Sequence, residues 1–183
     1  AANAALVAWW KLDEASWNGT ASEVVDSAGA NHGTSSGGAT TKVGKIDRAG
    51  SFDGVNDLVN AGTANTMLQE NVTWSTSLWF YANSIGTDTT QTNRLLGKES
   101  SGTSMVFIGV INDATSANSI SFWVLGTTGM RARSASNSIG TGAWYHLVLV
   151  FDGSSTAANQ KFYINGALVS HQQDINGVTP TDN

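Results

Sequence analysis

Two aspartates and an asparagine lie close together in the segment Asp53-Gly-Val-Asn-Asp57, around a glycine that permits a tight turn. Carboxylate and amide oxygens on a bend are the hard ligands that calcium prefers. Asp53, Asn56 and Asp57 are therefore our candidate ligands for a structural Ca2+. The spacing differs from that of an EF-hand loop. The same five residue types are also common in hairpin turns, so a turn without metal remains the alternative.

A second group of side chains has the chemistry to bind a sugar. Aromatic rings stack on the CH groups of a pyranose, and cationic side chains donate hydrogen bonds to hydroxyls or to acidic sugars. Packing is the competing interpretation, because tryptophans of a β-sandwich are more often buried than exposed to a ligand. The candidate ligand-binding residues are Trp79, Tyr81, Trp123, Arg94, Lys98 and Trp17.

Several individual residues carry specific expectations. Trp17 lies beside Asn18-Gly19 in a predicted loop, so we expect it to be exposed. His32, also in a predicted loop, is placed to touch a ligand, whereas His146, inside a predicted strand, is expected to be a hydrogen-bonded core residue. For the pair Asp13-Glu14, we expect one acid to hydrogen-bond a neighbouring loop.

Catalysis is disfavoured by the distribution of acids. Glycosidases use two carboxyl groups that flank the scissile bond, and on a strand this requires acids at alternate positions. The acids of this chain fall almost entirely in predicted turns, and no Gly-x-Ser-x-Gly segment supports a serine nucleophile. Since the chain has no cysteine, thiolate chemistry and disulfides are also excluded. We therefore expect a binding protein and not an enzyme.

Composition narrows the class of partner. The 183 residues include only nine lysines and arginines and carry a formal net charge of −5, which argues against nucleic acid and anionic membranes. The sequence has no run of eighteen apolar residues, so we expect no membrane insertion. Low charge, no cysteine and a surface rich in Ser, Thr and Asn favour an extracellular location or the surface of a cell or virion.

Short segments with period-two alternation recur along the chain between turn clusters, which is typical of an all-β sandwich. In the strand at 72–81, alternation places Trp74, Thr76, Leu78 and Phe80 on one face, which we expect to form core. The strand at 144–151 is bulky on both faces and is predicted to be central and covered on both sides. Residues 26–44 are predicted to be a long surface loop, and Asn165-Gly166 a two-residue hairpin. The other predicted strands are 6–12, 50–53, 58–60, 94–98, 105–111, 119–125, 130–134 and 161–164.

Seven segments, in this order, resemble the laminin G-like, pentraxin-like group of the concanavalin A-like lectin/glucanase superfamily. They are LVAWWKLDE (6–14), DSAGANHGT (26–34), GKIDRAGSFDGVNDLVN (44–60), VTWSTSLWFYAN (72–83), LLGKES (95–100), GAWYHLVLVFDGS (142–154) and KFYINGALV (161–169). The resemblance implies an all-β fold: one antiparallel two-sheet jelly-roll domain over residues 1–183. The family pattern continues with two more strands past Thr179, so we expect the sandwich to lack its C-terminal strands.

The resemblance also implies a function. In relatives a calcium lies near the loop that matches 53–57 and near the loop that matches 26–29, so Asp26 becomes a further candidate calcium ligand. We expect a non-catalytic, calcium-stabilised carbohydrate-binding module of a larger extracellular protein, whose partner is a glycan or polysaccharide. The alternative is a structural or adhesion domain that mediates protein–protein assembly, with neighbouring domains or chains completing its sheet.

Overall fold

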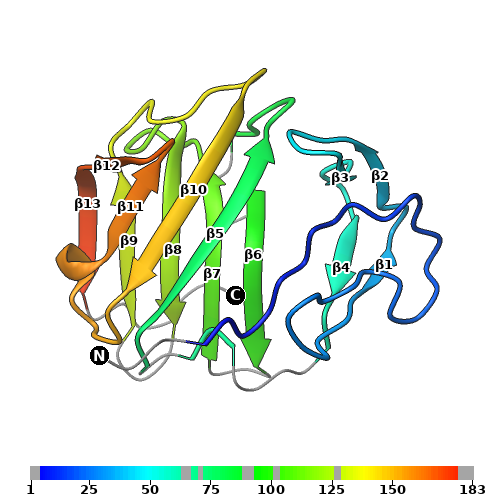
Figure 1. Ribbon diagram of the computed structural model, residues 1–183. Helices are drawn as coiled ribbons and strands as arrows, with labels where there is room; N and C mark the ends of the chain where they lie inside the picture. The colour runs from blue at the N-terminus through cyan, green and yellow to red at the C-terminus, as the bar shows by residue number, and fades with distance from the viewer. Residues whose placement is uncertain are drawn as a thin grey trace. The chain divides into compact units, whose positions relative to one another are not determined.

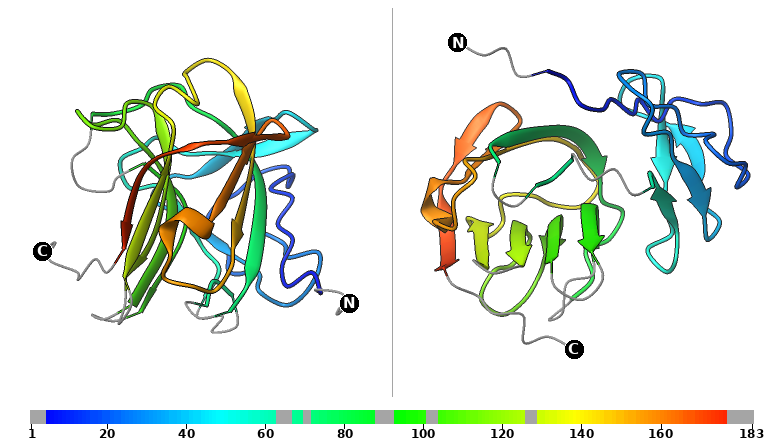
Figure 2. Two further views of the ribbon diagram at one scale, coloured as in Figure 1. Left: turned by 90° about the vertical axis from the view of Figure 1, so that its left-hand side faces the viewer. Right: turned by 90° about the horizontal axis from the view of Figure 1, so that it is seen from below.

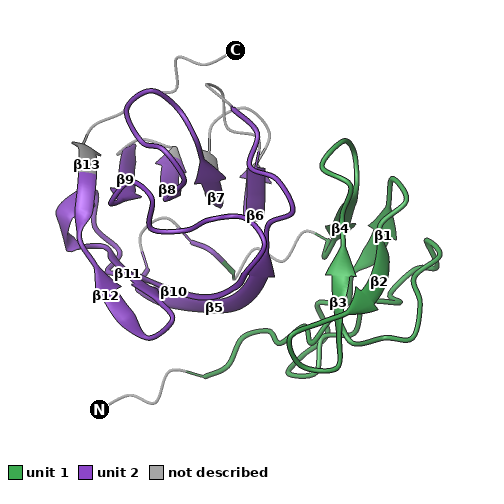
Figure 3. Cartoon of the chain, turned by 90° about the horizontal axis from the view of Figure 1, so that it is seen from above, with its two compact units in different colours: residues 1–67 green, residues 68–183 purple. Residues whose placement is uncertain are grey.

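The computed structural model describes residues 5–62, 67–69, 72–87, 93–100, 104–125 and 129–176. The chain forms two compact units, residues 1–67 (unit 1) and residues 68–183 (unit 2), each of which is described by itself (Figure 3). Within the described ranges both units consist of strands and loops, with one short 3-10 turn, η1 (Ala157–Asn159), in unit 2, so the predicted all-β class is confirmed. Two compact units fit either one domain or two, and the single domain over 1–183 stays a prediction. The described part of the chain contains no apolar helix of membrane-spanning length.

Unit 2 is built from two antiparallel sheets in separate layers (Figure 1). The four-stranded sheet has the order β12-β11-β10-β5, made of β5 (Trp74–Tyr81), β10 (Trp144–Phe151), β11 (Lys161–Ile164) and β12 (Ala167–Val169). The five-stranded sheet has the order β13-β9-β8-β7-β6, made of β6 (Asn93–Ser100), β7 (Ser104–Ile111), β8 (Ser119–Leu125), β9 (Met130–Ser134) and β13 (His171–Asn176). Seen along the strands, these two sheets curve toward each other around a common interior (Figure 2).

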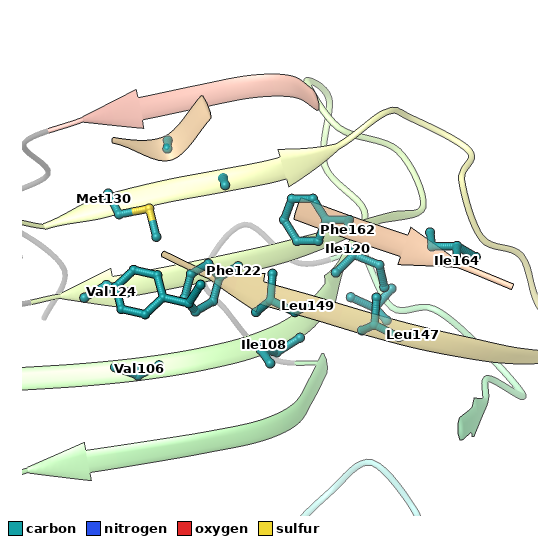
Figure 4. Close-up of a cluster of buried hydrophobic side chains, with 14 of the residues drawn as sticks. Val106, Ile108, Ile120, Phe122, Val124, Met130, Leu147, Leu149, Phe162 and Ile164 are labelled. Atoms are coloured by element: carbon teal, nitrogen blue, oxygen red, sulfur yellow. The ribbon is translucent and has the colours of Figure 1, made fainter. Parts of the chain in front are cut away.

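The interior of unit 2 is a continuous apolar core between the two sheets (Figure 4). Strand alternation explains it, since every second residue of a strand points to the same face. On β5 the expected face is confirmed: Trp74, Leu78 and Phe80 pack on the core. Phe122 of β8 is fully buried and meets Trp74 edge to face, with ring centroids 5.6 Å apart. These aromatic contacts couple the two layers.

Strand β10 is central, as predicted, because it lies between β11 and β5. Its inward residues, Leu147, Leu149 and Phe151, are fully buried. Its outward residues are only half-buried, so the expectation that both faces are covered was wrong. Bulky outward side chains can instead shield one another in cross-strand pairs, without a third layer above them.

Unit 1 holds two short two-stranded antiparallel sheets (Figure 3). One pairs β1 (Thr34–Ser36) with β4 (Leu58–Asn60), and the other pairs β2 (Thr40–Val43) with β3 (Arg48–Ser51). The prediction of a surface loop throughout 26–44 was wrong, because its Thr and Ser residues form β1 and β2, where β-branched threonine fits a pleated strand. The predicted strand at 50–53 corresponds to β3, which begins and ends two residues earlier. The predicted strand at 58–60 corresponds to β4.

The expected strand at 6–12 does not form. This segment makes one isolated bridge, between Trp10 and Asp26, and it leaves the extended conformation at Leu12, whose φ is +61°. A positive φ is unfavourable for leucine and cannot continue a strand. By contrast, the hairpin predicted at Asn165-Gly166 is confirmed, because both residues have the positive φ values, 52° and 82°, that this turn requires.

Candidate functional site

The outward face of the four-stranded sheet presents a cluster of rings that we call the aromatic face, formed by Trp79, Tyr81, Trp144 and His146. The β5–β10 register sets Trp79 directly opposite His146 and Tyr81 directly opposite Trp144. The Trp79 and His146 rings are stacked with centroids 5.0 Å apart, and the Tyr81 and Trp144 rings lie 5.6 Å apart at a tilt of 59°. Trp79 and Tyr81 remain 43% and 41% exposed.

Polar groups lie within the aromatic face. The Nε2 atom of His146 is 2.8 Å from the Oγ of Ser77, and the His146 backbone N–H donates to Oδ1 of Asn165 at 2.9 Å. His146 is hydrogen-bonded as expected, but the prediction that it belongs to the core was wrong. It occupies an outward position of β10, since Leu147 beside it points inward and adjacent side chains of a strand face opposite ways. Imidazole and hydroxyl thus stand beside the indole of Trp79.

The two ring pairs follow each other along the strands. Two residues of an antiparallel strand advance by about 7 Å, which is the spacing of the Trp79–His146 pair from the Tyr81–Trp144 pair. Neither β5 nor β10 contains Asp, Glu, Lys or Arg. This arrangement can stack on flat apolar surfaces and exchange hydrogen bonds with hydroxyls, and it offers no fixed charge for an ionic ligand.

Two of the other predicted ligand residues lie on the outward face of the five-stranded sheet, in a row of stacked groups across four strands. Arg94 of β6 lies over the ring of Phe107 at 5.2 Å, Phe107 stacks on Trp123 at 5.4 Å, and the guanidinium of Arg131 lies 4.6 Å from the Trp123 ring. Trp123 is only 6% exposed, and Arg94 forms an ion pair with Glu99. Trp123 therefore packs within this row, away from the aromatic face.

Lys98 is separated from Arg94 by a register shift. The pairing of β6 with β7 is irregular between Arg94 and Leu96, so Arg94 pairs with Gly109 and Lys98 with Val106. Directly paired residues share a face, and Val106 is buried in the core, so Lys98 occupies the inward side of its edge strand. One extra residue in a strand moves the residues after it to the opposite face, and a regular strand would have kept the two cations together.

Trp17 belongs to unit 1, where it forms the centre of a small core with Val24 and Ala39. It is 5% exposed, so the expectation of an exposed loop residue was wrong. Its indole N–H donates to Oε2 of Glu14 at 2.9 Å, while the other Glu14 oxygen accepts from the Val25 backbone N–H. The expectation that an acid of the Asp13-Glu14 pair bonds a neighbouring loop is thereby confirmed. A hydrogen-bonded indole can be buried even when its chain segment is irregular.

The Asp53–Asp57 segment forms a tight loop closed by its own carboxylates. The Asp57 Oδ2 atom accepts from the Asp53 backbone N–H at 2.8 Å, and the Asp53 Oδ1 atom accepts from the Val55 N–H at 2.8 Å. The other Asp57 oxygen, Oδ1, is buried and has no hydrogen-bond partner within the described ranges. The carbonyl of Asn56 lies against Gly37, where a Cβ atom would be 2.2 Å from that oxygen. The loop is therefore held firmly, with one carboxylate oxygen left unsatisfied.

Asp26 is 3% exposed and is surrounded by donors. Its Oδ1 accepts from the N–H groups of Trp9 and Ala28 at 2.8 and 2.9 Å, and its Oδ2 accepts from the backbone and side-chain nitrogens of Asn31 at 3.1 and 3.2 Å. Burial by itself would raise the pKa of this carboxyl, but the hydrogen bonds together lower the pKa to about 2. The Asp26 N–H also donates to Nδ1 of His32. Asp26 ties three loop segments together.

These geometries bear differently on a bound calcium. Asp57 fits, because a buried carboxylate oxygen without a donor is an available oxygen ligand, and Asp53 lies beside it. Asp26 fits poorly, because four N–H groups already occupy its lone pairs. Across the residues that the structure describes, no three His, Asp or Glu side chains gather closely enough to hold a metal ion. A calcium at the 53–57 loop would thus rely on neutral oxygens besides the two aspartates.

Comparison with known proteins identifies one family. A family model described as the concanavalin A-like lectin/glucanases superfamily, Laminin_G_3, matches residues 52–183, which is most of the chain and includes all of unit 2. The comparisons with curated proteins and with solved structures gave no significant match.

Proposed function

The chain belongs to the concanavalin A-like lectin/glucanases superfamily, and on this basis we propose that it is a non-catalytic module that binds a neutral glycan through its aromatic face. Domains of the laminin G-like type are binding modules and are generally non-catalytic. The observation that carries the proposal is the pair of ring contacts Trp79–His146 and Tyr81–Trp144 on the open side of a sheet.

The chemistry of this face selects the glycan. Indole and phenol faces stack on the apolar CH face of a pyranose, and about 7 Å separates the two ring pairs, so successive stretches of one extended chain can rest on them. Ser77 and His146 supply hydroxyl and imidazole groups for sugar hydroxyls. Because β5 and β10 carry no fixed charge, we propose a neutral polysaccharide and not an acidic one. An extracellular or surface location follows from such a partner.

Replacing both Trp79 and Trp144 by alanine should strongly weaken glycan binding. Loss of one stacked ring in a carbohydrate contact of this kind costs roughly 1 kcal/mol or more, so the double variant should bind at least about 30-fold more weakly. The measurement is a screen of neutral and acidic polysaccharides on immobilised protein, followed by titration calorimetry of the tightest one.

The control for this binding experiment is Leu168→Ala on β12, an exposed apolar position of the same sheet. Leu168 pairs with Tyr163 of β11, and two strands, β11 and β10, separate it from β5. This variant removes exposed apolar surface away from β5, and we expect its glycan affinity to equal that of the parent. The proposal fails if the folded protein binds no polysaccharide, or if the double variant binds as well as the parent.

Calcium is the second part of the proposed function. We propose that Asp53 and Asp57 hold a structural Ca2+, because Asp57 Oδ1 is buried and has no donor within the described ranges. The ion would supply charge neutralisation and would fix the 53–57 loop. No contact of the sugar with the ion is part of this proposal.

Melting curves with and without chelator test the metal. A ligand that binds only the folded state stabilises by about 2.7 kcal/mol at 100 times its Kd, so calcium should raise Tm by roughly 5 °C or more. The variant Asp53→Ala, Asp57→Ala should lose this shift. Asp26→Asn should melt lower but keep the full shift, since the Asp26 oxygens are occupied by N–H donors. Equal curves with and without calcium for the parent protein would disprove the metal site.

A further inference from the structure

Asn165 lies in the hairpin between β11 and β12, beside the aromatic face. The β10–β11 register ends with Leu147 opposite Ile164. The next step along both strands brings Asn165 next to His146, where the Asn165 N–H donates to the His146 carbonyl at 2.8 Å and the His146 N–H donates to the Asn165 Oδ1 at 2.9 Å. Since His146 is paired with Trp79 on its other side, Asn165 extends that row across the sheet.

The carboxamide of Asn165 is held in one orientation. The His146 N–H needs an acceptor, so the oxygen and not the nitrogen of the carboxamide faces β10. The backbone of Asn165 is fixed as well, because its φ of +52° is the value that the hairpin requires. The side chain is thus ordered before any ligand arrives, and little conformational entropy is lost when it makes a further contact.

The nitrogen of this carboxamide has no task within the described part of the chain. Asn165 is exposed, and its Nδ2 makes no hydrogen bond to the described residues. The turn beside it has room, because a Cβ at Gly166 would meet none of the described atoms within 4 Å. With its oxygen engaged by His146, the carboxamide offers two N–H groups as donors. A fixed donor therefore borders the aromatic face.

The strand spacing places this donor at the edge of a stacked sugar. Neighbouring strands lie about 4.8 Å apart, so Asn165 stands about one strand spacing from His146 and two from Trp79. A pyranose that rests its CH face on the Trp79–His146 pair projects its hydroxyls sideways from the ring edge. The hydroxyls on the β11 side are directed toward Asn165.

We infer that Asn165 is a specificity-determining residue of the glycan site, whose Nδ2 donates a hydrogen bond to a hydroxyl oxygen at the edge of the sugar on the Trp79–His146 pair. The inference rests on the proposed glycan binding. Stacking by itself accepts any sugar with an apolar CH face, whereas a fixed donor on one side favours sugars that carry a hydroxyl there. Sugars without that hydroxyl leave the donor unpaired and bind more weakly.

Titration calorimetry with cellohexaose, xylohexaose and mannohexaose tests this role, because these neutral β-1,4-linked chains differ in the groups at the ring edge. Asn165→Asp keeps an oxygen that accepts from the His146 N–H and tolerates a positive φ, but it has no N–H to donate. It should bind the preferred hexasaccharide roughly three- to tenfold more weakly, as expected for one lost hydrogen bond, and should distinguish the three chains less well.

Two further variants serve as controls. Asn137→Asp makes the same change at another exposed asparagine with a positive φ, 58°, and should bind like the parent. Asn165→Gly keeps the hairpin φ but removes the whole carboxamide, so the His146 amide should exchange its hydrogen faster than in the parent. In Asn165→Asp this amide should stay protected, while both Asn165 variants lose affinity to a similar extent.

The outcomes separate this inference from the proposed function. Parent affinity and selectivity in Asn165→Asp, with a loss only in Asn165→Gly, overturn the inference, because Asn165 would then serve only the backbone of β10. The proposed function would stand in that case, provided that Trp79→Ala, Trp144→Ala still weakens binding. A folded parent chain that binds none of the three hexasaccharides overturns the neutral, extended glycan partner and the role of Asn165 with it.

Discussion

Replacing Phe122 by alanine will lower the free energy of unfolding of unit 2 by about 3–5 kcal/mol. Phe122 is fully buried at the centre of the core. Its ring meets Phe151 of the facing sheet and Trp74 at centroid distances of 5.5 and 5.6 Å. Alanine removes both aromatic contacts and leaves a cavity between the two sheets. The hydrogen-bonded strands can move only partly into this cavity, so packing contacts are lost.

Urea denaturation measures the effect of Phe122→Ala. A lower midpoint with an unchanged m-value reports a loss of stability and not a change of the unfolded state. Val148→Ala is the matched control, because Val148 is an outward, half-buried residue of β10 that loses the same kind of surface outside the core. It should cost less than about 1 kcal/mol. Equal losses for the two variants would show that the interior of unit 2 is not the main source of its stability.

Replacing Asp26 by alanine will destabilise unit 1 by about 3 kcal/mol or more. The carboxylate accepts from the backbone N–H groups of Trp9, Ala28 and Asn31, and a hydrogen bond to a charged group contributes about 1.5–3 kcal/mol. Unit 1 has a small core around Trp17, so its loops depend on such hydrogen bonds more than unit 2 does. Asp13→Ala in the same unit removes a carboxylate that is not buried and should change stability little.

The same carboxylate makes unit 1 sensitive to acid. The pKa of Asp26 is lowered from 3.8 to about 2, because its hydrogen bonds together outweigh the effect of burial. A carboxyl whose folded pKa is lowered stabilises the fold fully above its unfolded pKa, and this contribution is lost as the pH falls through the folded pKa. Glu23 behaves alike: burial raises its pKa, but bonds from Ser35, Asn18 and Gly19 lower the pKa from 4.5 to about 2.

Stability of the parent should therefore fall between about pH 4.5 and pH 2. Denaturation curves across this range should show a shallower fall for Asp26→Ala, because that variant has already lost the group that titrates. An identical pH dependence for the parent and the variant would contradict the assignment of Asp26 as the acid-sensitive link.

The strands of unit 2 could be predicted in most respects from the sequence. Alternation in 74–81 correctly assigned Trp74, Leu78 and Phe80 to the core, because period-two patterning follows directly from strand geometry. β12 was predicted only as the second arm of the Asn165-Gly166 hairpin, and β13 was not predicted. β12 is three residues long, and β13, HQQDIN, is mostly polar, so neither shows a hydrophobic period.

The candidate binding site was predicted only in part. Trp79 and Tyr81 were identified on β5, but Trp144 and His146 were missed as members of the same face. The signal was present, since outward positions of 144–151 alternate with its buried ones. The β5–β10 register brings the four rings together from segments that lie far apart in the chain, and pairing over such a separation leaves no local mark in the sequence.

Seven ordered segments carried the resemblance to the family. Residue types and short periods were enough to establish the all-β class, the inward face of β5 and the weakly charged, turn-rich character of the chain. These properties are local, because a period of two is set by the geometry of each strand. Only the folded arrangement determined which of the candidate residues work together. Pairing across the sheet made Trp79 and Tyr81 part of an aromatic face, a bulge sent Lys98 to the side opposite Arg94, and hydrogen bonds made Asp26 and Trp17 structural. Burial and cross-strand register arise only when distant segments meet, and they determine whether a side chain binds or packs.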